Sequence, residues 1–96
     1  MTYFEELQKR VEETCKCEAI HEQTVSVTET YGDRIVWMGD VQVFRLNGNP
    51  KAKVCYAWGH PIETGPREIT TVLEIPPVRS AADAVRVAVA SHARNR

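Results

Sequence analysis

The stretch from Val54 to His60 alternates large amphipathic side chains with small ones. Residues two apart in a β-strand point to the same face, so Tyr56, Trp58 and His60 would share one side of a sheet. Aromatic rings with a polar tip stack on bases, line pockets and are enriched at protein interfaces. We therefore predict a binding surface on this face. The candidate binding residues, two of them from the neighbouring strand, are Trp37, Arg45, Tyr56, Trp58 and His60.

The cysteines and histidines do not form a recognisable metal motif. Cys15, Cys17 and His21 lie close in the sequence. Zinc sites, however, mostly use two matched pairs of ligands, each pair separated by two to four residues. The remaining candidates here are the isolated residues Cys55, His60 and His92. We therefore predict neither a metal site nor a bound cofactor.

Catalytic motifs are also missing from the sequence. His60 and Cys55 have opposite strand parity, so they would point to opposite faces of a sheet. A pair of His60 with Glu63 across a turn is a common surface arrangement and lacks an orienting third group. The chain contains no phosphate-binding glycine loop, no Gly-x-Ser-x-Gly elbow and no His-Glu-x-x-His helix. No catalytic residue is predicted, and a non-enzymatic role is favoured.

The surrounding pattern predicts two helices and an antiparallel sheet between them. Thr2 and Glu5 form a capping box for a helix of about four turns, and Ser80 with Asp83 opens the last helix. Between the helices, alternating β-branched and aromatic residues are separated by Gly, Asn and Pro turns. The predicted strands are Thr24–Thr30, Ile35–Leu46, Ala52–His60 and Ile69–Ile75, with a loop from Ile62 to Pro66.

This order gives one α+β domain over residues 1–96, an antiparallel meander of three to four strands flanked by the terminal helices. The parity of the second strand slips, since Ile35, Trp37, Val41 and Val43 share one face and Phe44 the other. We expect a bulge at Gly39 or at the Val43-Phe44 step. We also expect both helices on one face, leaving the aromatic face bare. The alternative is that the aromatics form the ordinary core and the small residues face outward.

Composition and charge restrict the classes of partner that the chain is expected to bind. The net charge is −1, which argues against nucleic acid as the main ligand. Residues 1–40 hold nine acids and four bases, and residues 41–96 hold four acids and eight bases, so the two parts carry −5 and +4. Such parts can attract each other within one fold or between two copies. With no apolar run of membrane length, no export signal and three cysteines, a cytoplasmic protein with reduced thiols is predicted.

The sequence resembles a known protein family, and its order of elements resembles a known fold. The stretch from Trp37 to Ala52, the run Cys55-Tyr56-Ala57-Trp58 and the segment from Val72 to Val78 resemble a family of small uncharacterised bacterial proteins. This resemblance implies a bacterial cytosolic origin and assigns no functional residue. The order of elements also resembles the double-stranded RNA-binding fold. The start of the last helix, however, holds Asp83 where that fold places a basic cluster to grip phosphates.

Three functions follow as hypotheses. The first is a non-enzymatic interaction domain that forms a homodimer through the aromatic sheet face or an edge strand. The second is a small-molecule site or weak enzyme around Trp37, Trp58 and His60, which requires a concavity beside them. The third is single-stranded nucleic-acid binding on the same rings, assisted by the basic side chains Arg45, Lys51 and Lys53.

Overall fold

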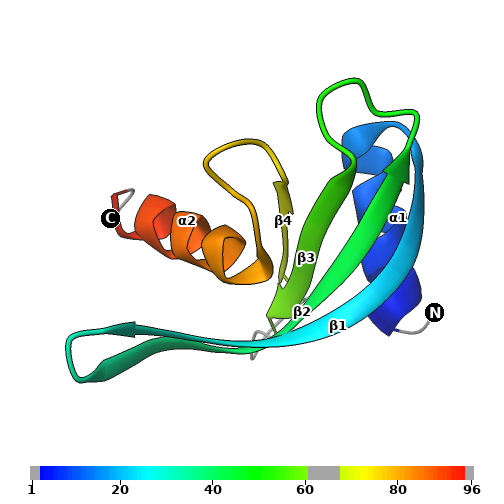
Figure 1. The fold of residues 1–96 in the computed structure, drawn as a ribbon. Helices are drawn as coiled ribbons and strands as arrows, with labels where there is room; N and C mark the ends of the chain where they lie inside the picture. The colour runs from blue at the N-terminus through cyan, green and yellow to red at the C-terminus, as the bar shows by residue number, and fades with distance from the viewer. Residues whose placement is uncertain (1–2, 61–67, 95–96) are drawn as a thin grey trace.

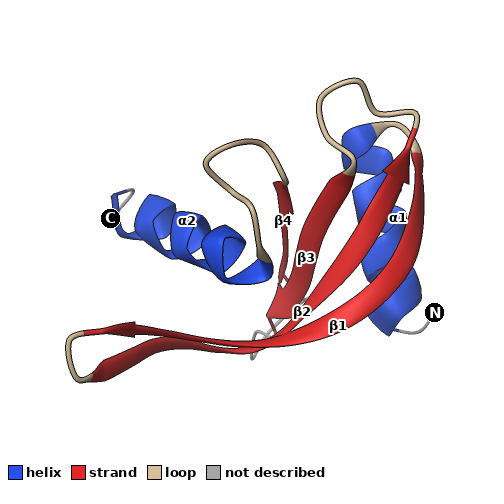
Figure 2. Ribbon diagram, viewed as in Figure 1, coloured by secondary structure: helices blue, strands red, loops and turns tan. Residues whose placement is uncertain are grey.

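The computed structural model of the chain describes residues 3–60 and 68–94, and it confirms the α+β class and the order of elements (Figures 1 and 2). The predicted Thr2 cap and the Ile62–Pro66 loop lie outside the described residues. The elements are α1 (Tyr3–Cys15), β1 (Glu18–Tyr31), β2 (Arg34–Asn47), β3 (Val54–His60), β4 (Glu68–Leu73) and α2 (Ala81–Arg94).

The four strands form one antiparallel meander in the order β1-β2-β3-β4. β1 and β2 pair from Glu18 and Asn47 out to Tyr31 and Arg34, which a two-residue turn connects. Gly32 has φ +63 in that turn, a conformation that residues with a Cβ rarely adopt. β3 pairs with β2 only between Gln42 and Arg45. The distal parts of β1 and β2 therefore extend beyond the body as a two-stranded ribbon (Figure 1).

The two helices pack on opposite faces of the sheet, so the prediction of both on one face is wrong. Leu7 and Val11 of α1 lie in a core with Cys55 and Ala57. α2 lies on the other face, where Ala81, Ala84 and Val85 share a second core with Tyr56, Trp58 and Val43. The side-chain sizes explain this arrangement. The bulky stripe of α1 fills the space over small strand residues, and the alanine-rich stripe of α2 accommodates the large rings.

Because a helix covers each face of the sheet, β2 buries apolar residues on both of its faces, which explains why its alternating pattern changes. Val41 and Val43 face α2, whereas Phe44 and Leu46 face α1. All four are buried, and β2 itself carries no extra residue between them. The predicted bulge at Gly39 is wrong, because the pairing is continuous there. At the Val43-Phe44 step the pairing does shift, but the extra residue is Glu22 of β1, between His21 and Gln23; a second shift lies between Glu29 and Thr30.

The start of α2 is confirmed as predicted. The Ser80 Oγ accepts a hydrogen bond of 3.2 Å from the backbone N–H of Asp83. The Asp83 carboxylate in turn accepts the N–H of Arg79 at 3.1 Å. The first bond satisfies a backbone donor that the first helical turn leaves without an intrahelical partner, the second ties down the residue before the cap, and the carboxylate suits the positive end of the helix dipole. They fix the point at which the chain enters α2, beside β1.

Candidate functional site

The aromatic residues of β3 are interior residues. Tyr56 is 5% exposed and Trp58 is 4% exposed, both in the core under α2. Trp37 is half-buried and meets Trp58 edge to face, with ring centroids 5.5 Å apart. The expectation of a bare aromatic face is therefore wrong, because α2 covers the rings. The two tryptophans stabilise the core and are not available to bases or to a partner in this fold.

The other two candidate residues lie apart from the tryptophan pair. Arg45 is exposed, and its Nε lies 3.7 Å from a carboxylate oxygen of Glu22. His60 ends β3 opposite Glu68, and its side chain lies outside the described part of the structure. The structure thus brings Trp37, Tyr56 and Trp58 into one core and leaves Arg45 on the surface. Arg45 and the tryptophan pair therefore do not share one binding surface.

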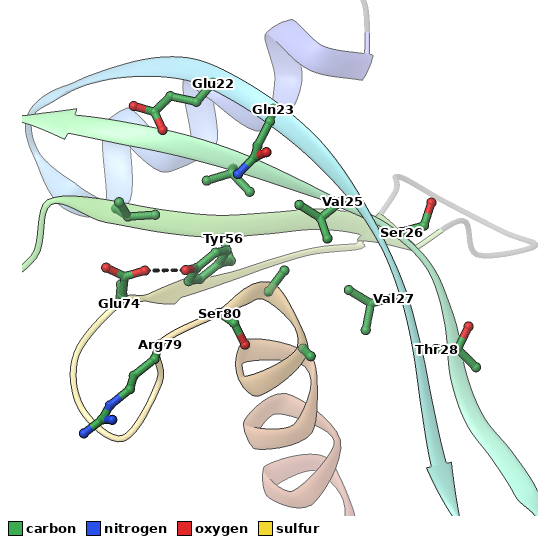
Figure 3. Close-up of a pocket in the computed structure, with 14 residues that line it drawn as sticks. Glu22, Gln23, Val25, Ser26, Val27, Thr28, Tyr56, Glu74, Arg79 and Ser80 are labelled. Carbon is green, nitrogen blue, oxygen red and sulfur yellow. Dashed lines mark hydrogen bonds between the residues drawn. The ribbon is translucent and has the colours of Figure 1, made fainter.

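The Tyr56 hydroxyl donates a hydrogen bond to the carboxylate of Glu74, at one edge of a cavity of about 600 Å³ (Figure 3). Burial raises the pKa of Tyr56 above its usual value, and the Glu74 and Asp83 carboxylates raise it further. The sequence analysis missed Glu74. Strand pairing could have indicated its position, because an antiparallel partner of β3 places the residue after β4 opposite Val54. The Val54 carbonyl indeed accepts the Glu74 N–H at 2.9 Å.

Four of the eight exposed large hydrophobic residues among the described part of the chain lie on the distal ribbon, namely Tyr31, Ile35, Val36 and Met38. We call residues 28–40 the hairpin arm. Met38 is 70% exposed, Ile35 is 60% exposed, and Val36 is also exposed. Met38 pairs with Thr28 and Ile35 with Thr30, so both point to the same side of the ribbon. Ile35 lies on this side because of the register shift between Glu29 and Thr30. The extra residue Val36 moves Ile35 away from the face of Trp37.

This apolar side of the arm continues onto α1. Phe4 is exposed near the start of α1 and lines a groove of about 620 Å³ together with Val36 and Met38. We call the four residues Phe4, Ile35, Val36 and Met38 the apolar arm face. Large apolar side chains gathered in this way on a small domain commonly mark an interaction site. The sequence analysis missed this surface because it assigned Ile35 to the same face as Trp37.

Next to the apolar arm face, hydrogen bonds hold the side chain of Gln42 in place. Gln42 is buried, and its side-chain oxygen lies 2.8 Å from the Nε2 of His21 and accepts the Thr24 hydroxyl at 2.6 Å. The His21 ring lies between Phe4 and Phe44, at centroid distances of 5.5 and 5.4 Å. These contacts hold Phe4 over the sheet beside the arm. Phe4 therefore presents a positioned ring.

All three cysteines are free and pack around the core under α1. Cys55 is fully buried. Burial raises its pKa to about 12, with further contributions from the nearby Cys15 thiol. The sequence analysis did not anticipate that Cys15 and Cys55 lie close together. Even so, within residues 3–60 and 68–94 no three His, Cys, Asp or Glu side chains are arranged to hold a metal ion.

Thiol labelling should separate these cysteines. At pH 8 we expect a small alkylating reagent to modify the half-buried Cys17 at least 100-fold faster than Cys55, because only an accessible thiolate reacts. Mass spectrometry of peptides after timed quenching measures both rates. In 8 M urea the two cysteines should react at similar rates. Equal labelling of Cys17 and Cys55 in the native protein would contradict the burial of Cys55.

Comparisons with known proteins add no relative, since no family model, no curated protein and no solved structure matches the chain. No helix among the described residues is both long enough and apolar enough to cross a membrane. A function must therefore be inferred from the geometry of this chain. Its two distinct features are the apolar arm face and the cavity beside Tyr56 and Glu74.

Proposed function

We propose that this protein is a non-enzymatic interaction domain that forms a homodimer through the hairpin arm. The observation that carries the proposal is the apolar arm face, whose four large side chains remain exposed although both sheet faces are otherwise covered by helices. Burying such side chains releases roughly 25 cal/mol for each Å² of apolar area removed from water. The aromatic residues under α2 stabilise the fold, and the contact surface lies on the arm.

Charge along the arm favours a second copy of this chain as the partner. Arg34 pairs with Tyr31 at the tip of the arm, so its exposed side chain starts on the side opposite Met38, and it forms no ion pair with any described residue. Asp40 lies at the base, exposed, and accepts a hydrogen bond of 2.9 Å from the Ser26 hydroxyl. When two arms lie antiparallel, the tip of each meets the base of the other. Two-fold symmetry then forms the Arg34–Asp40 contact twice.

The shape of the arm supports the same arrangement. A stable dimer buries about 800 Å² on each partner. The arm projects beyond the body, so a second arm can reach its apolar side, and Phe4 extends that side onto α1. The face is small and apolar with charged ends. This combination gives a self-complementary contact of modest affinity, in which the charges set the orientation and the apolar residues supply most of the free energy.

Sedimentation equilibrium over a micromolar concentration range tests the proposal. The wild-type protein should approach twice the mass of one chain. Met38→Asp should raise the dimer dissociation constant at least tenfold, because it places a carboxylate in the apolar contact on both copies. Val87→Asp is the matched control, since Val87 is an exposed apolar residue on the side of α2 that lies beside β4 and is not part of the apolar arm face. Its dissociation constant should stay within twofold of the wild-type value.

A charge exchange tests the antiparallel orientation. Arg34→Asp alone and Asp40→Arg alone should each weaken the dimer, because each places like charges together twice. The double variant Arg34→Asp/Asp40→Arg should recover most of the wild-type affinity. A wild-type protein that stays monomeric through the micromolar range would refute the homodimer. A dimer that Val87→Asp weakens as much as Met38→Asp would refute the arm as its contact.

A further inference from the structure

The cavity beside Tyr56 has the size of a small-molecule site. It measures about 600 Å³ and lies between β1, the end of β4 and the start of α2. This volume falls within the roughly 300–1,000 Å³ of known ligand pockets. In Figure 3, Val25 and Val27 of β1 point toward the space in front of α2. The other apolar lining residues are Val43, Val54, Ala81 and Ala82, together with the Tyr56 ring.

One carboxylate distinguishes this cavity from a plain apolar hollow. Glu74 is half-buried and accepts the Tyr56 hydroxyl, which orients the carboxylate at the cavity edge. A carboxylate can accept several hydrogen bonds, so Glu74 keeps accepting capacity for a ligand. Among the described residues no lysine or arginine forms an ion pair with Glu74. The position is thus anionic and open to a cationic group.

The remaining charges reinforce this polarity. Glu22 also lines the cavity, but its carboxylate oxygen lies 3.7 Å from the Nε of Arg45. Arg79 is the one basic residue of the lining, and Figure 3 shows its side chain extending away from the Tyr56–Glu74 pair. The raised pKa of Tyr56 has Glu74 and Asp83 among its causes, which agrees with a negative potential at this end of the cavity.

We propose that this cavity binds a small primary amine in its ammonium form, with a short apolar body. The ammonium group donates hydrogen bonds to Glu74, and the hydrocarbon lies against Val25, Val27 and Val43. A neutral molecule of the same shape lacks the charge-assisted hydrogen bond, and an anion would be repelled by the carboxylate. The cavity lies on the α2 side of the sheet and the apolar arm face on the other side. This binding therefore does not depend on the dimer.

Titration with hexylamine and with 1-hexanol at pH 7 tests the proposal on the intact protein. Backbone amide shifts in a nitrogen–proton correlation spectrum should change saturably with hexylamine, and the largest changes should lie at Val25, Val27, Ala81 and Ala82. 1-Hexanol should bind at least tenfold more weakly, since it has the same chain without the charge. Both ligands report on the wild-type protein, so this comparison does not depend on any variant folding.

Two variants assign the carboxylate. Glu74→Gln keeps the shape and an oxygen that can accept the Tyr56 hydroxyl, and it should weaken hexylamine binding at least tenfold. Glu22→Gln is the matched control, because it removes the other glutamate of the lining, and it should change the affinity less than twofold. Absence of saturable shifts, equal affinity for hexylamine and 1-hexanol, or equal losses in the two variants would each overturn the proposal.

Discussion

Trp58→Ala should lower the free energy of unfolding by about 3–5 kcal/mol, the usual range for removing a large buried aromatic side chain. Trp58 is 4% exposed and packs in the core between the sheet and α2. The substitution removes the ring contact with Trp37 and leaves a void that the alanine-rich start of α2 cannot fill. Urea unfolding followed by circular dichroism measures the change.

Two companion variants make this experiment decisive. Tyr31→Ala removes an aromatic side chain that is 81% exposed on the hairpin arm, and it should change the free energy of unfolding by less than about 0.5 kcal/mol. Trp58→Phe keeps most of the apolar volume and should cost clearly less than Trp58→Ala, so it stays measurable if the alanine variant is unfolded without urea. Similar small effects for Trp58→Ala and Tyr31→Ala would mean that α2 does not cover Trp58.

The element order followed from local signals in the sequence. Ser80 and Asp83 mark the start of α2 because the capping bonds join residues three or four positions apart. The two-residue turn at Gly32 is similarly local, since its positive φ depends on one residue. Contacts of this kind are specified by short stretches of chain. They can be predicted without knowing which elements meet in space.

Predicting which face of the sheet each helix covers requires knowing how the surface of the helix and the surface of the sheet fit together. Small residues on one face of β3 were expected to lie under both helices, and only α1 lies there. The alanine-rich stripe of α2 fits the larger rings of Tyr56 and Trp58 equally well, because what must match is the combined volume of the two surfaces. Size complementarity between whole surfaces, rather than the character of one face, decides which helix covers which side.

The candidate surface was missed for a related reason. Strand parity in the sequence assigned Ile35 to the face of Trp37, and parity holds only while the register is continuous. The extra residue Val36 shifts the pairing between Glu29 and Thr30, so Ile35 joins Met38 on the other side. A bulge in a two-stranded ribbon has no strong sequence signature. The apolar arm face therefore becomes visible only with the pairing in hand.

The second prediction with a large expected effect is a loss of stability at alkaline pH, which the ionisation of Cys55 causes. Burial first, and the neighbouring Cys15 thiol next, raise the pKa of Cys55 from 9.0 to about 12 in the folded protein. The unfolded chain loses this proton near pH 9, whereas the folded chain keeps it until near pH 12. The contribution of the neutral thiol to stability is therefore fully present below pH 9. It is lost as the pH rises from 9 toward 12.

The expected magnitude follows from the slope of about 1.4 kcal/mol per pH unit for one proton that only the folded state holds. Between pH 8 and pH 11 the wild-type protein should lose about 2–3 kcal/mol more of its unfolding free energy than Cys55→Ala loses. The pKa values of Cys15 and Tyr56 are also raised, so the wild type and Cys55→Ala both keep some alkaline destabilisation in the same direction. The difference between the curves isolates Cys55.

A second substitution separates titration from packing. Cys55→Ala leaves a small void among Leu7, Phe44 and Ala57, whereas Cys55→Val fills the space without a titratable group. The two variants should differ in stability at pH 7 and still show the same shallow decline toward pH 11, because neither can lose a proton at this position. Urea unfolding at pH 8, 9, 10 and 11 under reducing conditions gives the three curves. A wild-type curve parallel to both variants would show that Cys55 ionises equally in the folded and unfolded states, which a thiol buried between α1 and the sheet cannot do.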